Sequence, residues 1–157
     1  MRNKFLLTVI FFSLNFFSIG LTNAQDQFNF NISEIEILEN GNKIIGSKRG
    51  EVSTGDGFTI EADNFIYEKI ENILNASGNV IIKDTLNDYN IYSNNITYEK
   101  NSEKIFSKGE TKTEIGSRFI LDSIDVIFSR DKKILSSNKD TSIIDNNEQT
   151  QVQLKKF

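Results

Sequence analysis

The chain has 157 residues, enough for one domain with a modest hydrophobic core. It contains no cysteine and no histidine, which excludes disulfides, thiolate metal sites and every catalytic arrangement that needs a histidine base. The formal net charge of −4 disfavours nucleic acid as a partner, because nucleic-acid binding calls for a clustered basic face.

Residues 1–24 have the pattern of a secretory signal peptide. Arg2 and Lys4 supply a positive start, residues 5–19 form an apolar stretch, and Ala24 ends a short segment before the polar part of the chain. An uncleaved membrane anchor is the alternative, but the apolar stretch is short beside the roughly 17–25 residues that span a bilayer. No cysteine follows it, so a lipoprotein anchor is excluded. We predict cleavage after Ala24.

The mature chain, residues 25–157, is predicted to be a single domain with a net charge of −6, because Arg2 and Lys4 leave with the signal peptide. It begins with a hairpin signal. Glu39-Asn40-Gly41-Asn42 lies between two pairs of isoleucines, and Asn-Gly in such a place is typical of a two-residue hairpin turn.

From residue 50 onward the sequence repeats about every thirty residues, in units that begin at Gly50, Gly78 and Gly109. In each unit two apolar residues and a small one follow at spacings of two, and then two more apolar residues follow in the opposite parity. The matching sets are Phe58, Tyr89 and Phe119; Ile60, Ile91 and Leu121; Ala62, Ser93 and Ser123; Phe65, Ile96 and Val126; and Tyr67, Tyr98 and Phe128. Three copies in register predict a repeat protein.

A spacing of two is the period of a strand with one buried face. The parity changes at Ala62-Asp63, Ser93-Asn94 and Ser123-Ile124, so we predict a bulge or corner there that keeps the apolar side facing inward. We expect the glycines that open the units to supply positive φ angles in tight turns between them. Residues 66–74 could form a short helix, but the aligned residues 97–105 lack helical spacing. We therefore predict strand-loop-strand in both.

The runs 60–67 (IEADNFIY) and 75–80 (NASGNV) resemble the repeat of the OstA-like lipopolysaccharide-transport family, which includes LptA and the N-terminal periplasmic domain of LptD. The second unit carries a looser version at 93–98. The third departs further, with Ile124 in the acidic position and Asn138 in place of glycine. The motifs are short, and the resemblance covers roughly residues 32–145.

The resemblance implies an all-β fold, an open V-shaped β-jellyroll of antiparallel strands, and a transport role without catalysis, cofactor or metal. The family's apolar interior carries the acyl chains of lipopolysaccharide (lipid A), and its members join end to end by pairing terminal strands, bridging toward the outer membrane. The segment after Thr141 resembles the place where LptD-type chains leave the periplasmic domain. The chain is then either a truncated LptD-type chain or a free-standing LptA-like one, in the periplasm and possibly associated with the outer membrane.

If the resemblance holds, the inward rows form a lipid groove; the alternative is a dry core of rows that pack on each other, as in a structural β-solenoid or adhesin module. We expect strands near 32–38 and 143–154 to be the unpaired ends, open to another Lpt-type jellyroll protein unless they are frayed. The predicted lipid-binding residues are Phe58, Ile60, Phe65, Tyr67, Tyr89, Ile91, Ile96, Tyr98, Phe119, Leu121, Val126 and Phe128.

Several polar groups have an ordinary interpretation beside a functional one. Short basic runs could meet lipid phosphates, but such runs are usually solvated loop residues; they are Lys48-Arg49, Arg130 with Lys132-Lys133, and Lys155-Lys156. Paired acidic residues could suggest calcium or catalysis, as in a polysaccharide lyase, but their spacing fits turns and corners better. These are Gly55-Asp56-Gly57, Asp84 with Asp88, Glu61 with Asp63, and Asp122 with Asp125.

Overall fold

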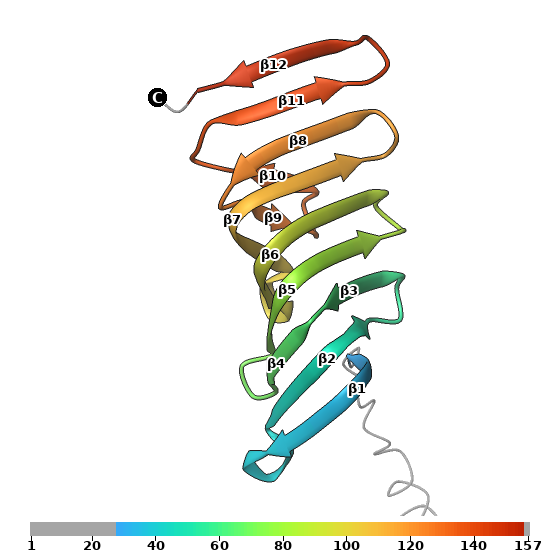
Figure 1. The fold of residues 1–157 in the computed structure, drawn as a ribbon, viewed down its shortest axis with the longest axis vertical. Helices are drawn as coiled ribbons and strands as arrows, with labels where there is room; N and C mark the ends of the chain where they lie inside the picture. Colours follow the sequence, from blue (N-terminus) through green and yellow to red (C-terminus); the bar gives the residue numbers. More distant parts are fainter. Residues whose placement is uncertain (1–27, 156–157) are drawn as a thin grey trace, which may run out of the picture.

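The computed structural model describes residues 28–155, so the predicted signal peptide lies outside the described residues. They form antiparallel strands that stack from β1 at one end to β12 at the other (Figure 1). Two short 3-10 turns, η1 (Glu39–Gly41) and η2 (Lys100–Ser102), join strands. The strands are β1 (Asn29–Leu38), β2 (Lys43–Ser53), β3 (Phe58–Ala62), β4 (Asn64–Glu68), β5 (Ile73–Asp84), β6 (Tyr89–Glu99), β7 (Lys104–Ile115), β8 (Phe119–Ile124), β9 (Ile127–Ser129), β10 (Ile134–Ser136), β11 (Thr141–Asp145) and β12 (Thr150–Leu154).

The sheet folds over into two walls because its long strands bend in the middle. On one side of the bends, the first half of β5 pairs with β4 and with the second half of β6. The second half of β6 also pairs with the first half of β7, which pairs with β9, and β9 pairs with β10. We call this the short wall. The other halves pair with β3 and β8, and β8 continues the sheet through β11 to β12. We call this the long wall. The bends form a fold line, and the hairpin turns at the far ends of the walls form a mouth.

The bends fall where the parity of the repeat changes. β3 ends at Ala62 and β4 begins at Asn64, and the pairing of β6 with β7 shifts between Ser93 and Asn95. In the third unit the break comes after Ile124, at Asp125, which has a φ of 53°. The predicted corners are confirmed in the first two units, and the third lies one residue further along. Each bend rotates the strand, so its apolar residues face the interior both before and after the bend.

The positive φ angles predicted for the glycines that open the units are confirmed at Gly78 and Gly109, but the glycines lie in these bends, so placing them in tight turns between units was wrong. Gly78 (φ 79°) and Gly109 (φ 89°) lie inside β5 and β7 at the fold line. At the matching bend of β2, Lys48 and Arg49 have the positive φ angles instead of Gly50. Gly50 serves close packing, because an added Cβ would lie 2.8 Å from the backbone oxygen of Asn31. The sequence period thus marks the bends, where backbone freedom is needed.

The predicted kinds of connection between strands are confirmed, but the predicted length of the first hairpin turn is wrong. β1 and β2 form the predicted hairpin, but the loop is η1 plus Asn42, whose N–H donates to the Glu39 oxygen at 3.1 Å. The predicted two-residue turn is therefore wrong, because Leu38 and Lys43 are the last pair. Strand-loop-strand is confirmed between β4 and β5 and between β6 and β7. Within residues 28–155 no helix has the length and apolar character needed to cross a membrane.

Candidate functional site

The twelve predicted lipid-binding residues all lie on the inner faces of the two walls. Ten of them are buried, with 0–6% of their surface exposed, and two on β8 are partly exposed. The buried ten are Phe58, Ile60, Phe65, Tyr67, Tyr89, Ile91, Ile96, Tyr98, Val126 and Phe128; the other two are Phe119 and Leu121.

Nine of the ten buried residues, all except Val126, pack in one cluster between the walls. The ring of Phe58 on the long wall lies 5.1 Å from that of Tyr98 on the short wall, and Tyr89 lies 4.3 Å from Phe128. Leu74, Ile82 and other residues of the central strands join the same cluster. The walls therefore close on each other from β3 to β7 as a packed core. Contact of these residues with lipid stays a prediction.

Phe28, which directly precedes β1, closes one end of this core and was missed by the sequence analysis. It is 5% exposed. Its ring lies 5.1 Å from that of Tyr67 and 5.8 Å from that of Tyr98, and the Lys100 ammonium lies 4.8 Å above it. Asn29 pairs with Ser53 of β2, and Ser53 pairs with Thr59 of β3 in the long wall, so Phe28 reaches from one wall to the other. It stands before the first repeat unit, where no periodic pattern marks it.

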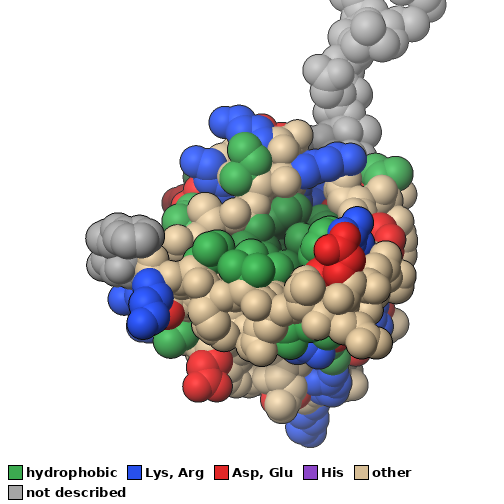
Figure 2. Space-filling view, turned by 90° about the horizontal axis from the view of Figure 1, so that it is seen from above, with side chains coloured by type: hydrophobic (Ala, Val, Ile, Leu, Met, Phe, Trp, Pro, Cys, Tyr) green, Lys and Arg blue, Asp and Glu red, His purple; other side chains and the backbone are tan. Residues whose placement is uncertain are grey.

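The C-terminal end of the long wall has an inner face that the short wall does not cover. Leu121, Ile143 and Val152 are neighbours in register on β8, β11 and β12. Exposure rises along this row, since Leu121 and Ile143 are partly exposed and Val152 is 51% exposed. Leu154 on the same face of β12 is also 51% exposed. Figure 2 looks at the molecule from this end and shows hydrophobic side chains gathered in the middle, with polar and charged ones around them.

A small cavity of about 70 Å³ lies where the packed core meets this open end. Tyr89, Ile115, Phe128 and Leu135 give it a mainly apolar lining, and Asn87, Thr113 and Lys133 complete it. Thr113 is 2% exposed, and its hydroxyl is the one buried side-chain polar atom in the described part of the chain without a hydrogen-bond partner. We call the cavity together with the uncovered inner face of β8, β11 and β12 the open end. It is the apolar, accessible region of the interior.

A charged cluster joins the two walls at the mouth. The guanidinium of Arg130, in the turn between β9 and β10, donates to Asp84 at 2.9 Å and Asp56 at 2.9 Å, both on the long wall. On the short wall it donates to Glu103 at 2.7 Å and to the Tyr98 hydroxyl at 3.2 Å. We call these five residues the Arg130 cluster. The guanidinium also lies 4.2 Å above the Phe58 ring.

Burial makes this cluster electrostatically unusual. Burial by itself raises the pKa of Asp84, but hydrogen bonds from Asn87, Arg130 and Tyr89 outweigh it and lower the pKa below the usual 3.8. Burial lowers the pKa of Arg130, and its bonds to Asp56 and Asp84 more than reverse this. Both groups are therefore charged at neutral pH and stabilise each other.

One of the predictions for polar groups is thus corrected, because Arg130 is 8% exposed and is not a solvated loop residue. Asp84 does belong to a turn, since it accepts from the Asn87 N–H at 2.9 Å, but it is only 1% exposed and also holds Arg130. A signal was present in the sequence, because Val80, Ile82 and Asp84 alternate and place Asp84 in an inward position. A carboxylate in an inward row needs a buried cation. Which of the basic residues supplies it depends on the fold.

Of the other polar candidates, Lys48, Arg49, Glu61 and Asp63 lie on the outer surface in ion pairs, and Lys156 lies outside the described residues. Glu61 accepts from Lys83 at 2.7 Å and from Arg49 at 3.2 Å, and Asp63 pairs with Arg49 at 3.3 Å. Lys48 pairs with Glu34. Such exposed pairs typically contribute about 0–1 kcal/mol each to stability. Their side chains neutralise each other.

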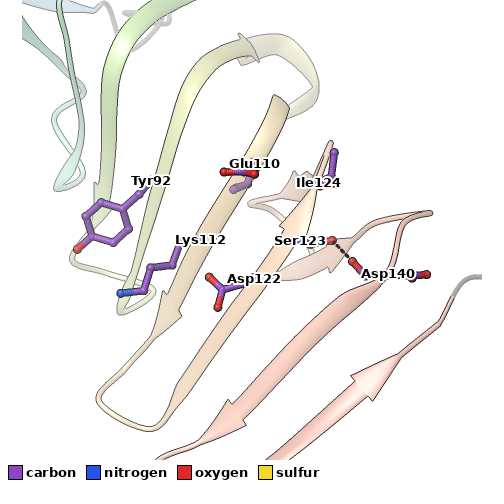
Figure 3. A pocket seen from close by; sticks show the side chains of 8 residues that line it. Tyr92, Glu110, Lys112, Asp122, Ser123, Ile124 and Asp140 are labelled. Carbon is purple, nitrogen blue, oxygen red and sulfur yellow. Dashed lines mark hydrogen bonds between the residues drawn. The ribbon is translucent and has the colours of Figure 1, made fainter.

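The outer face of the long wall carries a separate hollow of about 500 Å³ (Figure 3). Tyr92, Lys112 and Asp122 come from the neighbouring strands β6, β7 and β8, on the face opposite the interior. Glu110 and Asp140 add further acidic groups, and the Ser123 hydroxyl donates to the backbone oxygen of Asp140 at 3.5 Å. Charged walls oppose the burial of hydrocarbon, so the interior is the better candidate for lipid.

Comparison with solved structures identifies the architecture. The structure is similar to that of LptH, described as the LptA homologous periplasmic component of the conserved lipopolysaccharide transport device from Pseudomonas aeruginosa. The TM-score is 0.65, and the match covers 82% of this chain and 94% of LptH at 8% sequence identity. The chain has the fold of LptH. No protein-family model matches the sequence, and no curated protein matches it. The predicted all-β open jellyroll is confirmed.

Proposed function

We propose that this chain is a non-enzymatic carrier of lipopolysaccharide in the periplasm, which shields acyl chains of lipid A at its open end. The uncovered apolar row on β8, β11 and β12 is the observation that carries the proposal. This row consists of Leu121, Ile143 and Val152 and continues from the packed core. Because no opposite wall covers it, its apolar surface is free to contact a ligand. A sealed structural repeat would cap such a face with polar residues.

Hydrocarbon is the chemistry that this face suits. Each buried methylene contributes about 0.8 kcal/mol, so a dozen shielded methylenes outweigh a small set of polar contacts. The mainly apolar cavity below the open face gives a chain end a place to begin insertion. Lys133 at its edge supplies a positive charge for an anionic head group. The core residues between β3 and β7 would join the lipid site if the walls separate.

The likeness to LptH and the signal-type residues 1–24 support the proposed role and location. LptH is a periplasmic component of a lipopolysaccharide transport device, and the N-terminal pattern is typical of export. The predicted cleavage after Ala24 can be checked by N-terminal sequencing of the exported protein. Periplasmic export and a lipid-binding interior are separate parts of the proposal, and each can fail alone.

The lipid site is tested with two glutamate substitutions on the same strand. Leu121→Glu places a charge on the inner face of β8, and Ile124→Glu, at a residue that is 43% exposed, places one on the outer face. We expect Leu121→Glu to weaken binding of purified lipopolysaccharide and of a fluorescent fatty acid at least about tenfold, because a carboxylate must lose water against hydrocarbon. Ile124→Glu should bind as the natural chain does. Equal binding by both folded variants would contradict the lipid site and favour a structural repeat without cargo.

We further propose that the terminal strands pair with other jellyroll proteins of the same kind. β1 and β12 are the outermost strands of the described sheet, each paired on one side, and such edges are templates for strand addition. Joining β12 of one molecule to β1 of the next would extend the long wall toward the outer membrane. The apolar row that ends at Val152 and Leu154 would then continue onto the inner face of the next molecule.

A second copy is the simplest partner with which to test strand pairing. The chain has no native cysteine, so Asn31→Cys on the long-wall part of β1 and Gln151→Cys on β12 would be its only thiols. Head-to-tail pairing predicts a ladder of disulfide-linked multimers for the double variant under mild oxidation. Either single variant can give dimers at most and is the control. A double variant that stops at dimers would contradict pairing between copies.

A further inference from the structure

At the mouth the two walls are joined by side chains. Backbone hydrogen bonds of the mouth turns stay within a wall, as in Thr85 N–H to the Gly57 oxygen at 3.2 Å and Arg130 N–H to the Glu103 oxygen at 2.9 Å. Across the mouth, the Arg130 cluster and the ring of Phe28 make the contacts. At the fold line, by contrast, continuous strands connect the walls covalently.

The fold line has the backbone freedom of a hinge. Gly78 and Gly109 have positive φ angles there, and the pairing of β5 with β6 shifts between Ser77 and Val80. Such bends interrupt the ladder of hydrogen bonds, so a change of angle there disturbs few of them. A rotation about the fold line would separate the walls most at the mouth. The packing of the inner rows, such as that of Tyr89 against Phe128, resists this rotation, and the Arg130 cluster is the polar contact that resists it at the mouth.

The Arg130 cluster can be released more readily than a hydrophobic contact of the same size. It reaches solvent at the mouth, since the side chains of Asp56 and Glu103 are 41% and 35% exposed, so water can replace their bonds. A buried ion pair also contributes little net stability compared with apolar residues of the same volume, because its charges lose their hydration. Its geometry is specific, however, and this suits a contact that is either made or broken.

We propose that the Arg130 cluster is a latch that holds the mouth closed over the packed core. With the latch closed, acyl chains reach the interior only through the open end. With the latch released, the walls part along the mouth and expose the buried rows between β3 and β7 to lipid from the side. The proposal rests on the proposed lipid function for its purpose, while the opening itself is a property of the protein alone.

The opening is measured by pulsed electron spin resonance between two spin labels at the mouth. Ile70→Cys lies in the turn from β4 to β5 on the short wall, and Leu86→Cys lies in the turn from β5 to β6 on the long wall. These side chains are 73% and 72% exposed, so labels should be tolerated. In the labelled chain we expect a narrow distance distribution. Adding Arg130→Gln should shift it to longer distances and broaden it.

The matched control is Arg118→Gln in the same labelled chain. Arg118 also pairs with two carboxylates, Asp145 at 2.6 Å and Glu148 at 3.5 Å, but all three lie on the long wall. Its loss should leave the distance distribution unchanged. If Arg130→Gln does not fold, Asp56→Asn removes the charge of one latch carboxylate at a partly exposed residue and should give a smaller shift in the same direction. An unchanged distribution in a folded latch variant would overturn the latch.

Binding of a fluorescent fatty acid separates the latch from the lipid function. If the open state is a minor species of about 0.1–10%, releasing the latch should raise the apparent affinity about tenfold or more. A distance shift with no fatty-acid binding by any variant would support the latch and contradict the lipid function. Fatty-acid binding at the open end without a distance shift would support the function and overturn the latch.

Discussion

The two ends of the long wall share one strand pattern but differ in what covers them. Between β3 and β7 the inner residues meet the short wall and are almost fully buried, as Phe58, Ile82 and Ile91 show with exposures of 0–2%. Beyond β8 the wall continues through β11 and β12, where Val152 and Leu154 are each half exposed. The short wall ends with the three-residue strand β10. An inward row becomes a core or a binding surface according to what lies opposite.

The largest expected effect is on stability, and it compares two leucines on inner faces. Leu74 on β5 has no exposed surface, whereas Leu121 on β8 is partly exposed. Leu74→Ala should lower the free energy of unfolding by about 2–5 kcal/mol, because it leaves a cavity in a packed core. Leu121→Ala should cost about 1 kcal/mol or less, because water already reaches it. Urea unfolding followed by circular dichroism measures both, and equal costs would remove the distinction between the two regions.

Repetition allowed much of the fold to be predicted. The three sets beginning at Phe58, Tyr89 and Phe119 fix which face is inward, and the parity change fixes the bends, because both follow from the strand period of two. Loop details were less predictable, as at Glu39 and Asn40, which adopt positive φ angles in a four-residue loop. The site was also only partly predictable. Ile60 in the packed core and Leu121 at the open end occupy the same position of the repeat. The sequence pattern cannot distinguish them, because it does not show where the short wall ends.

The next effect is a pH dependence of the free energy of unfolding, and it tests whether the charge of Asp84 stabilises the mouth. Asp84 has a lowered pKa in the folded protein, so its ionised form stabilises the fold above its unfolded pKa, and this stabilisation is lost as the pH falls through the lower folded value. Asp84→Asn should lower the free energy of unfolding by about 1–3 kcal/mol at neutral pH, since a buried charged hydrogen-bond partner of Arg130 is lost.

The gap between the natural chain and Asp84→Asn should narrow as the pH falls below the ordinary aspartate value of 3.8. Urea unfolding at a series of pH values from neutral to about 3 measures the gap, because the carboxyl group protonates over that range in the unfolded chain. Asp122→Asn, on the outer face of β8, is the control and should change little at any pH. A gap that stays constant down to pH 3 would show that the charge of Asp84 does not stabilise the mouth.

The smallest effect compares two glycines of the fold line, one beside the packed core and one toward the open end. Gly78 and Gly109 have similar positive φ angles of 79° and 89°, so alanine at either should cost about 1–2 kcal/mol in backbone conformation. Their surroundings differ, however. A Cβ at Gly78 would lie 2.6–3.1 Å from atoms of the Asp63 side chain, whereas a Cβ at Gly109 has no neighbour within 4 Å.

Gly78→Ala should therefore unfold at a lower urea concentration than Gly109→Ala, by a difference of about 1 kcal/mol in the free energy of unfolding. The extra cost has a specific source, because Asp63 must move and lose its 2.7 Å hydrogen bond from the Asn79 amide. In an Asp63→Ala chain, which has already lost this hydrogen bond, adding Gly78→Ala should cost about as much as Gly109→Ala does in the natural chain. If the double variant keeps the extra cost, the difference lies in the strands that meet at the bend, and the fold line beside the packed core is the stiffer part of the hinge.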